Sequence, residues 1–281
     1  MPYRYHCMPI ASDPDLRQAR VGRTVSRRQF LTRIAPAAVI GLTAAACSTA
    51  GPAHRAGGHP TLPLAVIYRG PASAPGCAEA VAALLASAPS AFRTAYCGPD
   101  ERLPLTRATL AGAALYAQPG GGDDLDAAWA AVRPFADTLR SWIRDGGHYV
   151  GFCMGGFLAG SDPGFALLPG DSGEYITSPG ATVRDDGDAL VDVTWRGTRR
   201  AVYFQGGPDF TLDPDRRATV VATYPNGAIA ALAAPYGAGR VGVTGPHPEA
   251  PASWYRDAGL AVPDPLPFAI GHDLVRTTTG R

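Results

Sequence analysis

Apolar residues form short continuous runs in the middle of the chain, and helically spaced apolar positions lie between these runs. Runs of strand length occupy residues 64–68, 92–96, 113–117 and 149–152. Residues 77–85 have helical spacing, and a long helix is expected to carry Trp129, Val132, Phe135, Leu139 and Ile143 on one face. Buried strands that alternate with amphipathic helices predict an α/β fold with a parallel sheet covered on both faces.

The pattern changes after residue 160 to short strands separated by turn residues. We expect these strands at 175–183, 190–195, 201–204, 219–223, 228–233 and 240–244. Residues 185–188 and 225–227 contain Asp-Gly and Asn-Gly, which favour hairpin turns, and residues 264–281 predict a closing helix and a frayed tail. The chain therefore adds a region of further short strands to the parallel sheet, with no internal repeat.

The first sixty residues have a different character. Ser26-Arg27-Arg28-Gln29-Phe30-Leu31 matches the twin-arginine export pattern, and a modestly apolar run over 34–46 follows it. That run is too short to span a bilayer as a stable helix, and Pro36 weakens it further. We interpret residues 1–46 as a twin-arginine signal peptide.

Cys47 directly follows the small residues Ala44, Ala45 and Ala46, as in a lipoprotein processing site. Ala44-x-Ala46 also fits simple cleavage by an ordinary signal peptidase, and both alternatives stay open. With Cys47 lipidated, residues 47–60 form a flexible tether, and the protein sits on the outer face of the cytoplasmic membrane through its lipid anchor alone. The globular domain is then residues 61–281.

Composition narrows the classes of partner. The net charge is +1 and the body of the chain has no basic cluster, so nucleic acid is not an expected partner. The 5 cysteines have no zinc-ligand spacing, so neither a metal nor another cofactor is expected.

The most informative stretch is the glycine-rich segment 146–160, in which Gly151 and Gly155 flank Cys153. A strand, a sharp turn and a small-residue helix in that order present the central side chain at a helix N-terminus, where a thiolate is favoured. We predict that Cys153 is a nucleophile. The alternative is a buried structural cysteine at a glycine-rich strand end.

A thiol nucleophile needs a base and a group that orients the base, and His247-Pro248-Glu249 contains both. In an extended segment residues i and i+2 point to the same side, and Pro248 favours that geometry. We therefore predict a triad of Cys153, His247 and Glu249.

Acyl transfer also needs donors for an oxyanion. We predict the backbone N–H groups of Met154 and of Gly121, the latter from the glycine loop over residues 118–124. Gly120 and Gly122 would line the substrate site. The loop can equally be a helix N-cap with Asp123 or Asp124 as the capping residue, and the two roles are compatible.

Cys77 opens the first predicted helix and Cys97 closes the second predicted strand, which places both at one edge of a parallel sheet. A disulfide between them fits an exported protein. The alternative is two buried free thiols.

Taken together, these motifs resemble the class I glutamine amidotransferase-like superfamily, and within it the family of the biotin-protein ligase N-terminal domain. The resemblance is carried by Pro119-Gly120-Gly121-Gly122-Asp123, by residues 146–157, by Tyr203-Phe204-Gln205-Gly206-Gly207-Pro208 and by Gly245-Pro246-His247-Pro248-Glu249. It implies a flavodoxin-like sandwich with a mostly parallel central sheet and an added antiparallel strand region. Phe157 stands where glutamine amidotransferases usually carry a glutamine that helps to hold the substrate. An aromatic wall there argues against glutamine as the substrate.

The sequence therefore predicts an exported, membrane-tethered cysteine hydrolase of amidotransferase type that acts on a small-molecule or peptide amide. One alternative is a binding module that uses the same fold for a ligand or partner without catalysis. Another is a redox-responsive thiol, since an exposed cysteine of low pKa is easily oxidised.

Overall fold

The computed structural model describes residues 62–281. The predicted signal peptide, the tether and the candidate lipidation residue Cys47 lie outside the described residues. The domain boundary near residue 61 stays a prediction.

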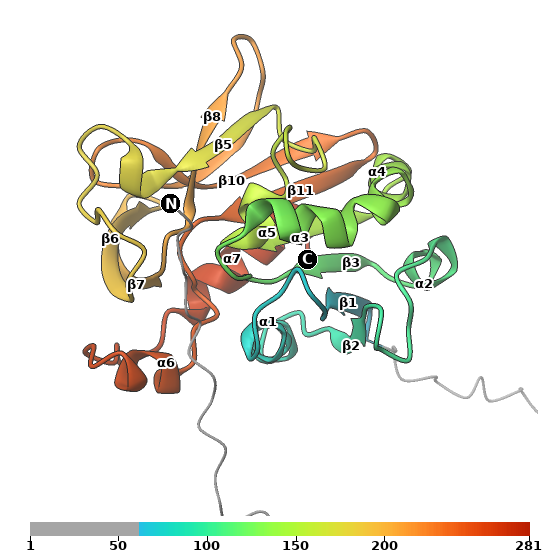
Figure 1. Cartoon of the computed structure of the whole chain (residues 1–281), viewed down its shortest axis with the longest axis horizontal. Coiled ribbons are helices and arrows are strands. Elements are labelled where there is room, and N and C mark those ends of the chain that lie inside the picture. The colour runs from blue at the N-terminus through green and yellow to red at the C-terminus, as the bar shows by residue number, and fades with distance from the viewer. Residues whose placement is uncertain (1–61) are drawn as a thin grey trace, which may run out of the picture. The chain divides into compact units, whose positions relative to one another are not determined.

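Five strands form a parallel sheet at the centre of the fold (Figure 1). In spatial order they are β2 (Arg93–Cys97), β1 (Leu64–Tyr68), β3 (Leu115–Gln118), β4 (His148–Phe152) and β11 (Gly239–Thr244). Each neighbouring pair in this series is parallel. Consequently the carboxyl ends of β3, β4 and β11 meet at one edge, where reactive groups gather in such sheets.

The sheet continues beyond β11 with antiparallel strands. These are β10 (Ile229–Tyr236), β9 (Thr219–Thr223), β6 (Ala189–Trp195) and β7 (Thr198–Phe204), while β8 (Pro208–Leu212) pairs with both β10 and β5 (Gly170–Glu174). The predicted fold class, a mostly parallel α/β sheet with an added antiparallel region, is confirmed.

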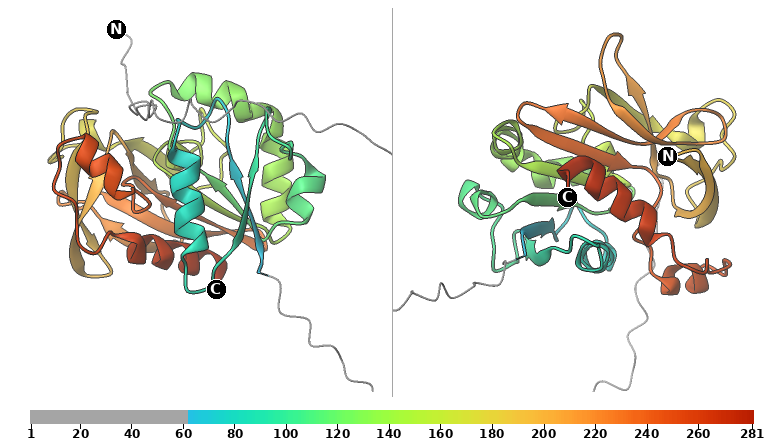
Figure 2. Two further views of the ribbon diagram at one scale, coloured as in Figure 1. Left: turned by 90° about the horizontal axis from the view of Figure 1, so that it is seen from below. Right: turned by 180° about the vertical axis from the view of Figure 1, so that it is seen from behind.

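Helices cover both faces of the parallel part (Figure 2). They are α1 (Cys77–Ala86), α2 (Arg107–Ala111), α3 (Leu125–Val132), α4 (Ala136–Arg144) and α7 (Phe268–Thr279), with the short α5 (Met154–Phe157) and α6 (Ala252–Asp257) near the sheet edge. Ile67 packs in a core cluster with residues of α1 and α7, whereas its neighbour Val66 packs in a second cluster with residues of α2 and α4. Successive strand residues point to opposite faces, so one apolar run supplies both cores.

The predicted long helix is wrong in one respect, because it is broken. α3 ends at Val132, a 3₁₀ turn covers Arg133–Phe135, and α4 begins at Ala136. Pro134 lies inside the 3₁₀ turn, and a proline has no N–H to continue the helical ladder.

The strand predicted at 175–183 is also wrong. β5 lies earlier, over Gly170–Glu174, and Tyr175–Thr177 form a 3₁₀ turn. Tyr175 is fully buried and its ring stacks on that of Tyr224 with centroids 3.7 Å apart. The apolar residues of this segment reach the core from a turn. Their sequence pattern is the same as that of a buried strand, so periodicity alone does not distinguish the two. As a result residues 185–188 do not connect paired strands, whereas the Asn226-Gly227 turn joins β9 and β10 as expected.

Cys77 and Cys97 do not form the disulfide considered above: both are buried thiols, as in the alternative. Cys97 packs in the core cluster that contains Tyr68 and Leu105, and burial raises the pKa of its thiol to about 12. Cys77 instead lies beside Gly120, on the inner side of the glycine loop. The two sulfurs thus have different neighbours.

Residues 62–281 contain neither a membrane-crossing helix nor a cluster of metal ligands. No helix in this range combines the length and the apolar character needed to cross a membrane. The same range holds no group of three or more His, Cys, Asp or Glu residues placed to bind a metal ion.

Candidate active site

Cys153 occupies a sharp turn between β4 and α5. Its backbone has φ 48° and ψ −106°, a conformation that non-glycine residues rarely adopt outside functional turns. A Cβ at Gly151 would lie 2.2 Å from the carbonyl oxygen of Gly155, and a Cβ at Gly155 would lie 2.1 Å from that of Gln118. Only glycine fits at either place, so the two glycines hold the thiol-bearing residue in its strained conformation.

The neighbouring strand β11 brings His247 to the same edge of the sheet. Phe152 is the register partner of Thr244, and the Cys153 N–H donates to the Thr244 carbonyl at 2.9 Å. Three residues later, the backbone N–H of His247 donates to the carbonyl of Tyr203 at 2.8 Å. The predicted nucleophile and base, 94 residues apart in sequence, are thus fixed by strand pairing (247 − 153 = 94).

His247 and Glu249 form a buried pair. Nδ1 of His247 lies 2.8 Å from Oε1 of Glu249, and their side chains are 2 % and 0 % exposed. Burial by itself lowers the pKa of His247, but the charge of Glu249 and the interactions with Cys153 raise it more, to well above the ordinary 6.5. The imidazole therefore favours its protonated state.

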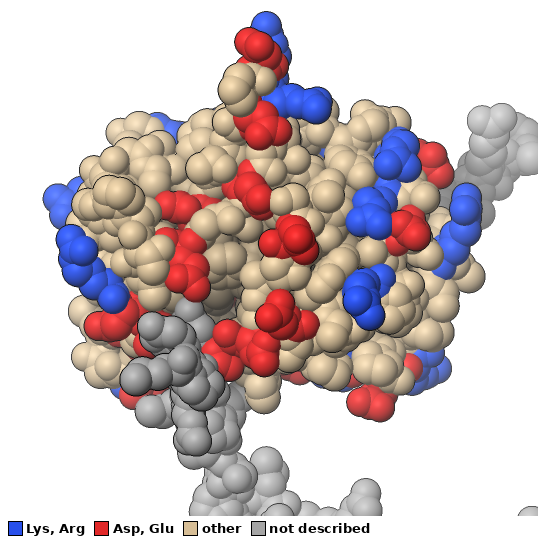
Figure 3. All heavy atoms as spheres, turned by 45° about the horizontal axis from the view of Figure 1, so that its top comes forward, with Lys and Arg blue, Asp and Glu red and all other residues tan. Residues whose placement is uncertain are grey.

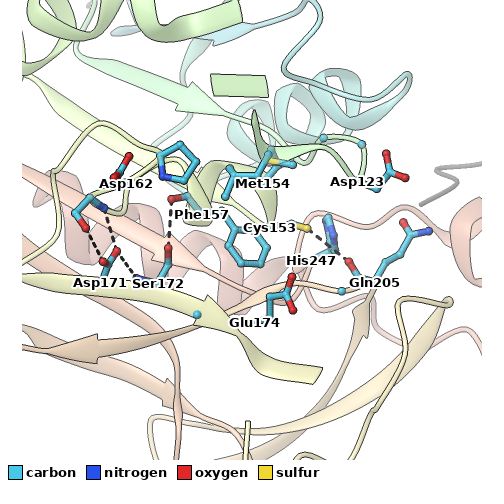
Figure 4. A pocket seen from close by; sticks show the side chains of 17 residues that line it. Asp123, Cys153, Met154, Phe157, Asp162, Asp171, Ser172, Glu174, Gln205 and His247 are labelled. Carbon is cyan, nitrogen blue, oxygen red and sulfur yellow. Dashed lines mark hydrogen bonds between the residues drawn. The ribbon is translucent and has the colours of Figure 1, made fainter. Parts of the chain in front are cut away.

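The other ring nitrogen of His247 faces the sulfur. Nε2 is buried and makes no hydrogen bond of ordinary geometry, while the interaction of the imidazole with Cys153 contributes to its raised pKa. The sulfur also donates to the carbonyl of Gln205 at 3.7 Å. Figure 4 shows the sulfur and the imidazole side by side at the centre of the site. The structure thus brings together all three residues of the predicted triad.

A cavity of about 190 Å³ opens in front of this pair. Cys153 is only 8 % exposed, yet it lines the cavity together with His247. It therefore combines the burial expected of a structural cysteine with access to a small molecule.

The two predicted oxyanion donors lie next to each other. A Cβ at Gly121 would be 2.6 Å from Cγ of Met154, and both residues line the cavity beside Cys153. The glycine loop also fulfils its alternative role, since Asp124 caps α3 by accepting the Ala127 N–H at 2.8 Å.

The candidate substrate-lining residues are placed differently from one another. Gly122 and Phe157 line the cavity, as expected. Gly120 does not, because it packs against the imidazole: a Cβ there would lie 2.9 Å from Cε1 of His247. Its missing side chain makes room for the base, and its role as a substrate-lining residue stays a prediction.

Sequence reasoning missed the opposite wall of the cavity. Strand β5 supplies Asp171, Ser172, Gly173 and Glu174, and the loop after α5 supplies Ser161, Asp162 and Pro163. This wall was missed because a strand was predicted at 175–183 in place of β5. β5 is short and has no alternation of apolar and polar residues that would identify it. Gln205 and Gly206 complete the lining, and only their Gly-Gly-Pro context in the sequence drew attention to them.

Aromatic rings that do not line the cavity pack against His247. Its ring contacts those of Tyr203 and Trp254 edge to face, with centroids 5.9 and 5.5 Å apart. Tyr203 in turn contacts Trp254 and the buried Tyr255. Such pairs fix ring orientation, which a base beside a sulfur requires.

Comparison with solved structures finds the same fold in proteins of low sequence identity. A chain from PurLQS of Thermotoga maritima superposes with a TM-score of 0.53 at 18 % identity, covering 78 % of this chain and 99 % of the other. A glutamine amidotransferase of Thermotoga maritima gives 0.51 at 15 % identity, with 78 % and 99 % covered. No family model matches the sequence, and no curated protein does. The chain therefore shares the flavodoxin-like fold of glutamine amidotransferases.

Proposed function

We propose that this protein is an exported cysteine hydrolase of amidotransferase type that cleaves an amide through Cys153, His247 and Glu249. One observation carries the proposal: a sulfur in a strained turn and a buried imidazole backed by a carboxylate line the same cavity. This combination of nucleophile, base and orienting group is the minimum for covalent acyl transfer.

The chemistry follows from the protonation of the pair. The Cys153 thiolate attacks the amide carbonyl, and the resulting oxyanion is held by the backbone N–H groups of Met154 and Gly121. His247 then gives its proton to the leaving nitrogen as the C–N bond breaks, which leaves a thioester and a free amine. A water molecule gives a proton to His247 and attacks the thioester, which releases a carboxylic acid and restores the starting pair.

Glu249 keeps His247 in the required state. Its carboxylate accepts from Nδ1, so that Nε2 faces the sulfur, and its charge favours the imidazolium. We further propose that the chain is closer to the biotin-protein ligase N-terminal domain family than to glutamine-using enzymes. Supporting this, Phe157 lines the cavity where the latter usually carry a glutamine.

The test combines labelling with turnover. Wild type, Cys153→Ala and His247→Ala are treated with a fluorescent iodoacetamide, and are then screened for amine release from amino-acid amides and dipeptides. We expect Cys153→Ala to lose both labelling at that site and hydrolysis, and His247→Ala to lose about 10³-fold or more in hydrolysis. Cys77→Ala is the matched control, since Cys77 is a buried thiol that does not line the cavity. Hydrolysis that survives in Cys153→Ala would contradict the proposal.

Export and anchoring are part of the same proposal and rest on residues 26–47 alone. Replacing Arg27 and Arg28 with lysine should stop export, and Cys47→Ala should remove a lipid adduct detectable by mass spectrometry. Secretion by the same route in the double lysine variant would contradict the twin-arginine interpretation. An unlipidated mature N-terminus would instead favour simple cleavage after Ala46.

A further inference from the structure

The cavity is lined by acidic side chains. Asp162, Asp171 and Glu174 line it together with Asp123, and none of its lining residues is a lysine or an arginine. A neighbouring hollow shares Asp123 and Glu174 and adds Asp185, Asp186 and a single arginine, Arg184. Figure 3 shows a face on which acidic side chains gather around a hollow while arginines lie to either side.

The carboxylates that line the cavity differ in their hydrogen-bond partners. Asp171 accepts hydrogen bonds from the Ser161 N–H, the Ser161 hydroxyl and the Ser172 N–H, which hold the loop after α5 against β5. Burial raises the pKa of Asp171, but these hydrogen bonds lower it more, so this carboxyl is ionised and already occupied.

Glu174 is different, because its carboxylate is exposed and makes no hydrogen bond or ion pair within the part of the chain that the structure describes. Figure 4 shows it extending from β5 toward Phe157 and Cys153. Asp162 is also exposed and without a hydrogen bond or ion pair in the described residues, but Figure 4 shows it farther from the sulfur, beyond Phe157. Glu174 is therefore the available carboxylate on the side of the cavity near the sulfur.

Two further observations indicate that a ligand belongs here. Nε2 of His247 is buried, lacks an ordinary hydrogen bond and lines the same cavity. Phe157 and Leu125 supply apolar surface to the same cavity as Glu174. A carboxylate beside apolar and aromatic surface suits a cationic group on an aliphatic stem, because the stem packs while the charge is paired.

We propose that the substrate is a cationic amide: an ammonium or guanidinium group on an aliphatic stem binds at Glu174 while the amide carbonyl reaches Cys153. This inference rests on the proposed function for the cleavage step, but the charge preference of the cavity does not. The positive charge of His247 is balanced by the paired carboxylate of Glu249, so it does not offset the acidic wall. Neutral and anionic amides of the same shape are discriminated against by the unpaired carboxylate.

The first experiment measures the charge preference without catalysis. Cys153 is modified with two methanethiosulfonate reagents, one carrying a trimethylammonium group and one a sulfonate, and the rates are followed by intact mass spectrometry. Cys153→Ala gives the background from the other thiols. We expect the cationic reagent to react about tenfold faster, and Glu174→Gln to reduce that ratio about threefold, with a smaller ratio in high salt.

Asp145→Asn is the matched control. Asp145 is exposed at the end of α4, just before β4 begins, so it lies at the opposite edge of the sheet from Cys153. Its removal changes the net charge by the same amount and should leave the ratio unchanged. Equal rates for the two reagents, or a ratio that Asp145→Asn lowers as much as Glu174→Gln does, would overturn the proposal.

The second experiment uses a matched pair of amides. Argininamide and citrullinamide have nearly the same shape and differ in charge, and each is tested for protection of Cys153 against N-ethylmaleimide and for hydrolysis. We expect argininamide to protect at about tenfold lower concentration, and Glu174→Gln to remove the difference. A preference without hydrolysis of any amide would sustain this inference and contradict the proposed function. Equal hydrolysis of both amides, lost in Cys153→Ala, would sustain the function and overturn the inference.

Discussion

The parallel and antiparallel parts of the sheet contribute different things to the site. In the parallel part, β4 and β11 end side by side, so that Cys153 pairs with Thr244, and His247 follows three residues later with its N–H on the Tyr203 carbonyl of β7. In the antiparallel part, β5 contributes the acidic wall of the cavity, and the end of β7 contributes Tyr203 behind the imidazole. The reacting groups thus follow directly after the ends of two paired strands, while the recognition surface comes from shorter, more irregular elements.

This difference between the two parts of the sheet assigns the reaction to one part and substrate recognition to the other. Groups fixed by strand register cannot move without disturbing the sheet, which suits a sulfur and an imidazole that must keep their geometry. Side chains on a short strand such as β5 can change without altering that register. We therefore expect substitutions in the parallel part to affect reactivity and stability together, and those in the antiparallel part to affect substrate choice.

The largest effect is expected at the turn that carries Cys153. In Gly155→Ala the new Cβ would meet the backbone oxygen of Gln118 at 2.1 Å, and we expect a loss of about 3 kcal/mol in the free energy of unfolding. Melting temperature should fall by roughly 6–12 °C, and iodoacetamide labelling of Cys153 should slow.

Gly122→Ala is the control for stability, since nothing lies within 4 Å of a Cβ at that position. It should change the free energy of unfolding by no more than about 0.5 kcal/mol. Equal melting temperatures for the two variants would show that the turn is not as tightly packed as the close approach of Gly155 to Gln118 indicates.

A smaller effect is expected from the aromatic support of His247. Trp254→Ala removes one edge-to-face contact with the imidazole, worth about 0.5–1.5 kcal/mol, so hydrolysis should fall about three- to tenfold through kcat with little change in KM. Trp254→Phe keeps an aromatic ring and should recover most of the rate. If both variants raise KM instead, Trp254 contacts the substrate and does not position the base.

The sequence predicted the parallel part of the fold better than the antiparallel part, for a physical reason. Buried parallel strands are continuous apolar runs, and β1 and β4 begin or end within one residue of their predicted bounds. In contrast, β5 has the sequence Gly-Asp-Ser-Gly-Glu and no apolar pattern, because one strand neighbour and a cavity surround it. Its pairing with β8 is a tertiary contact that local composition does not record.

The same contrast applies to the site. Cys153, His247 and Glu249 were recognisable because chemistry requires those residue types at strand ends, with glycines around the cysteine. Glu174 and Trp254 are ordinary residues whose roles depend on which segments pack together. Gly120 is an intermediate case: the sequence predicted the glycine loop that contains it, but not its contact with the imidazole of His247.

The central claim is that the sulfur of Cys153 and the imidazole of His247 share a proton, with Glu249 behind them. The most direct measurement is an NMR titration of the His247 ring in wild type, Cys153→Ala and Glu249→Gln, with the signal assigned by its loss in His247→Ala. Glu249 and Cys153 both raise the pKa of His247, so removing either should lower it.

The upward direction of the His247 pKa shift also determines how the stability of the fold depends on pH. Because the folded pKa lies above the ordinary 6.5, the proton on His247 stabilises the fold fully below that pH, and this contribution is lost as pH rises through the folded pKa. We predict a titration well above 6.5 in wild type and a lower one in each variant. An imidazole that titrates at or below 6.5 in wild type, or that is unaffected by Cys153→Ala, would contradict the account.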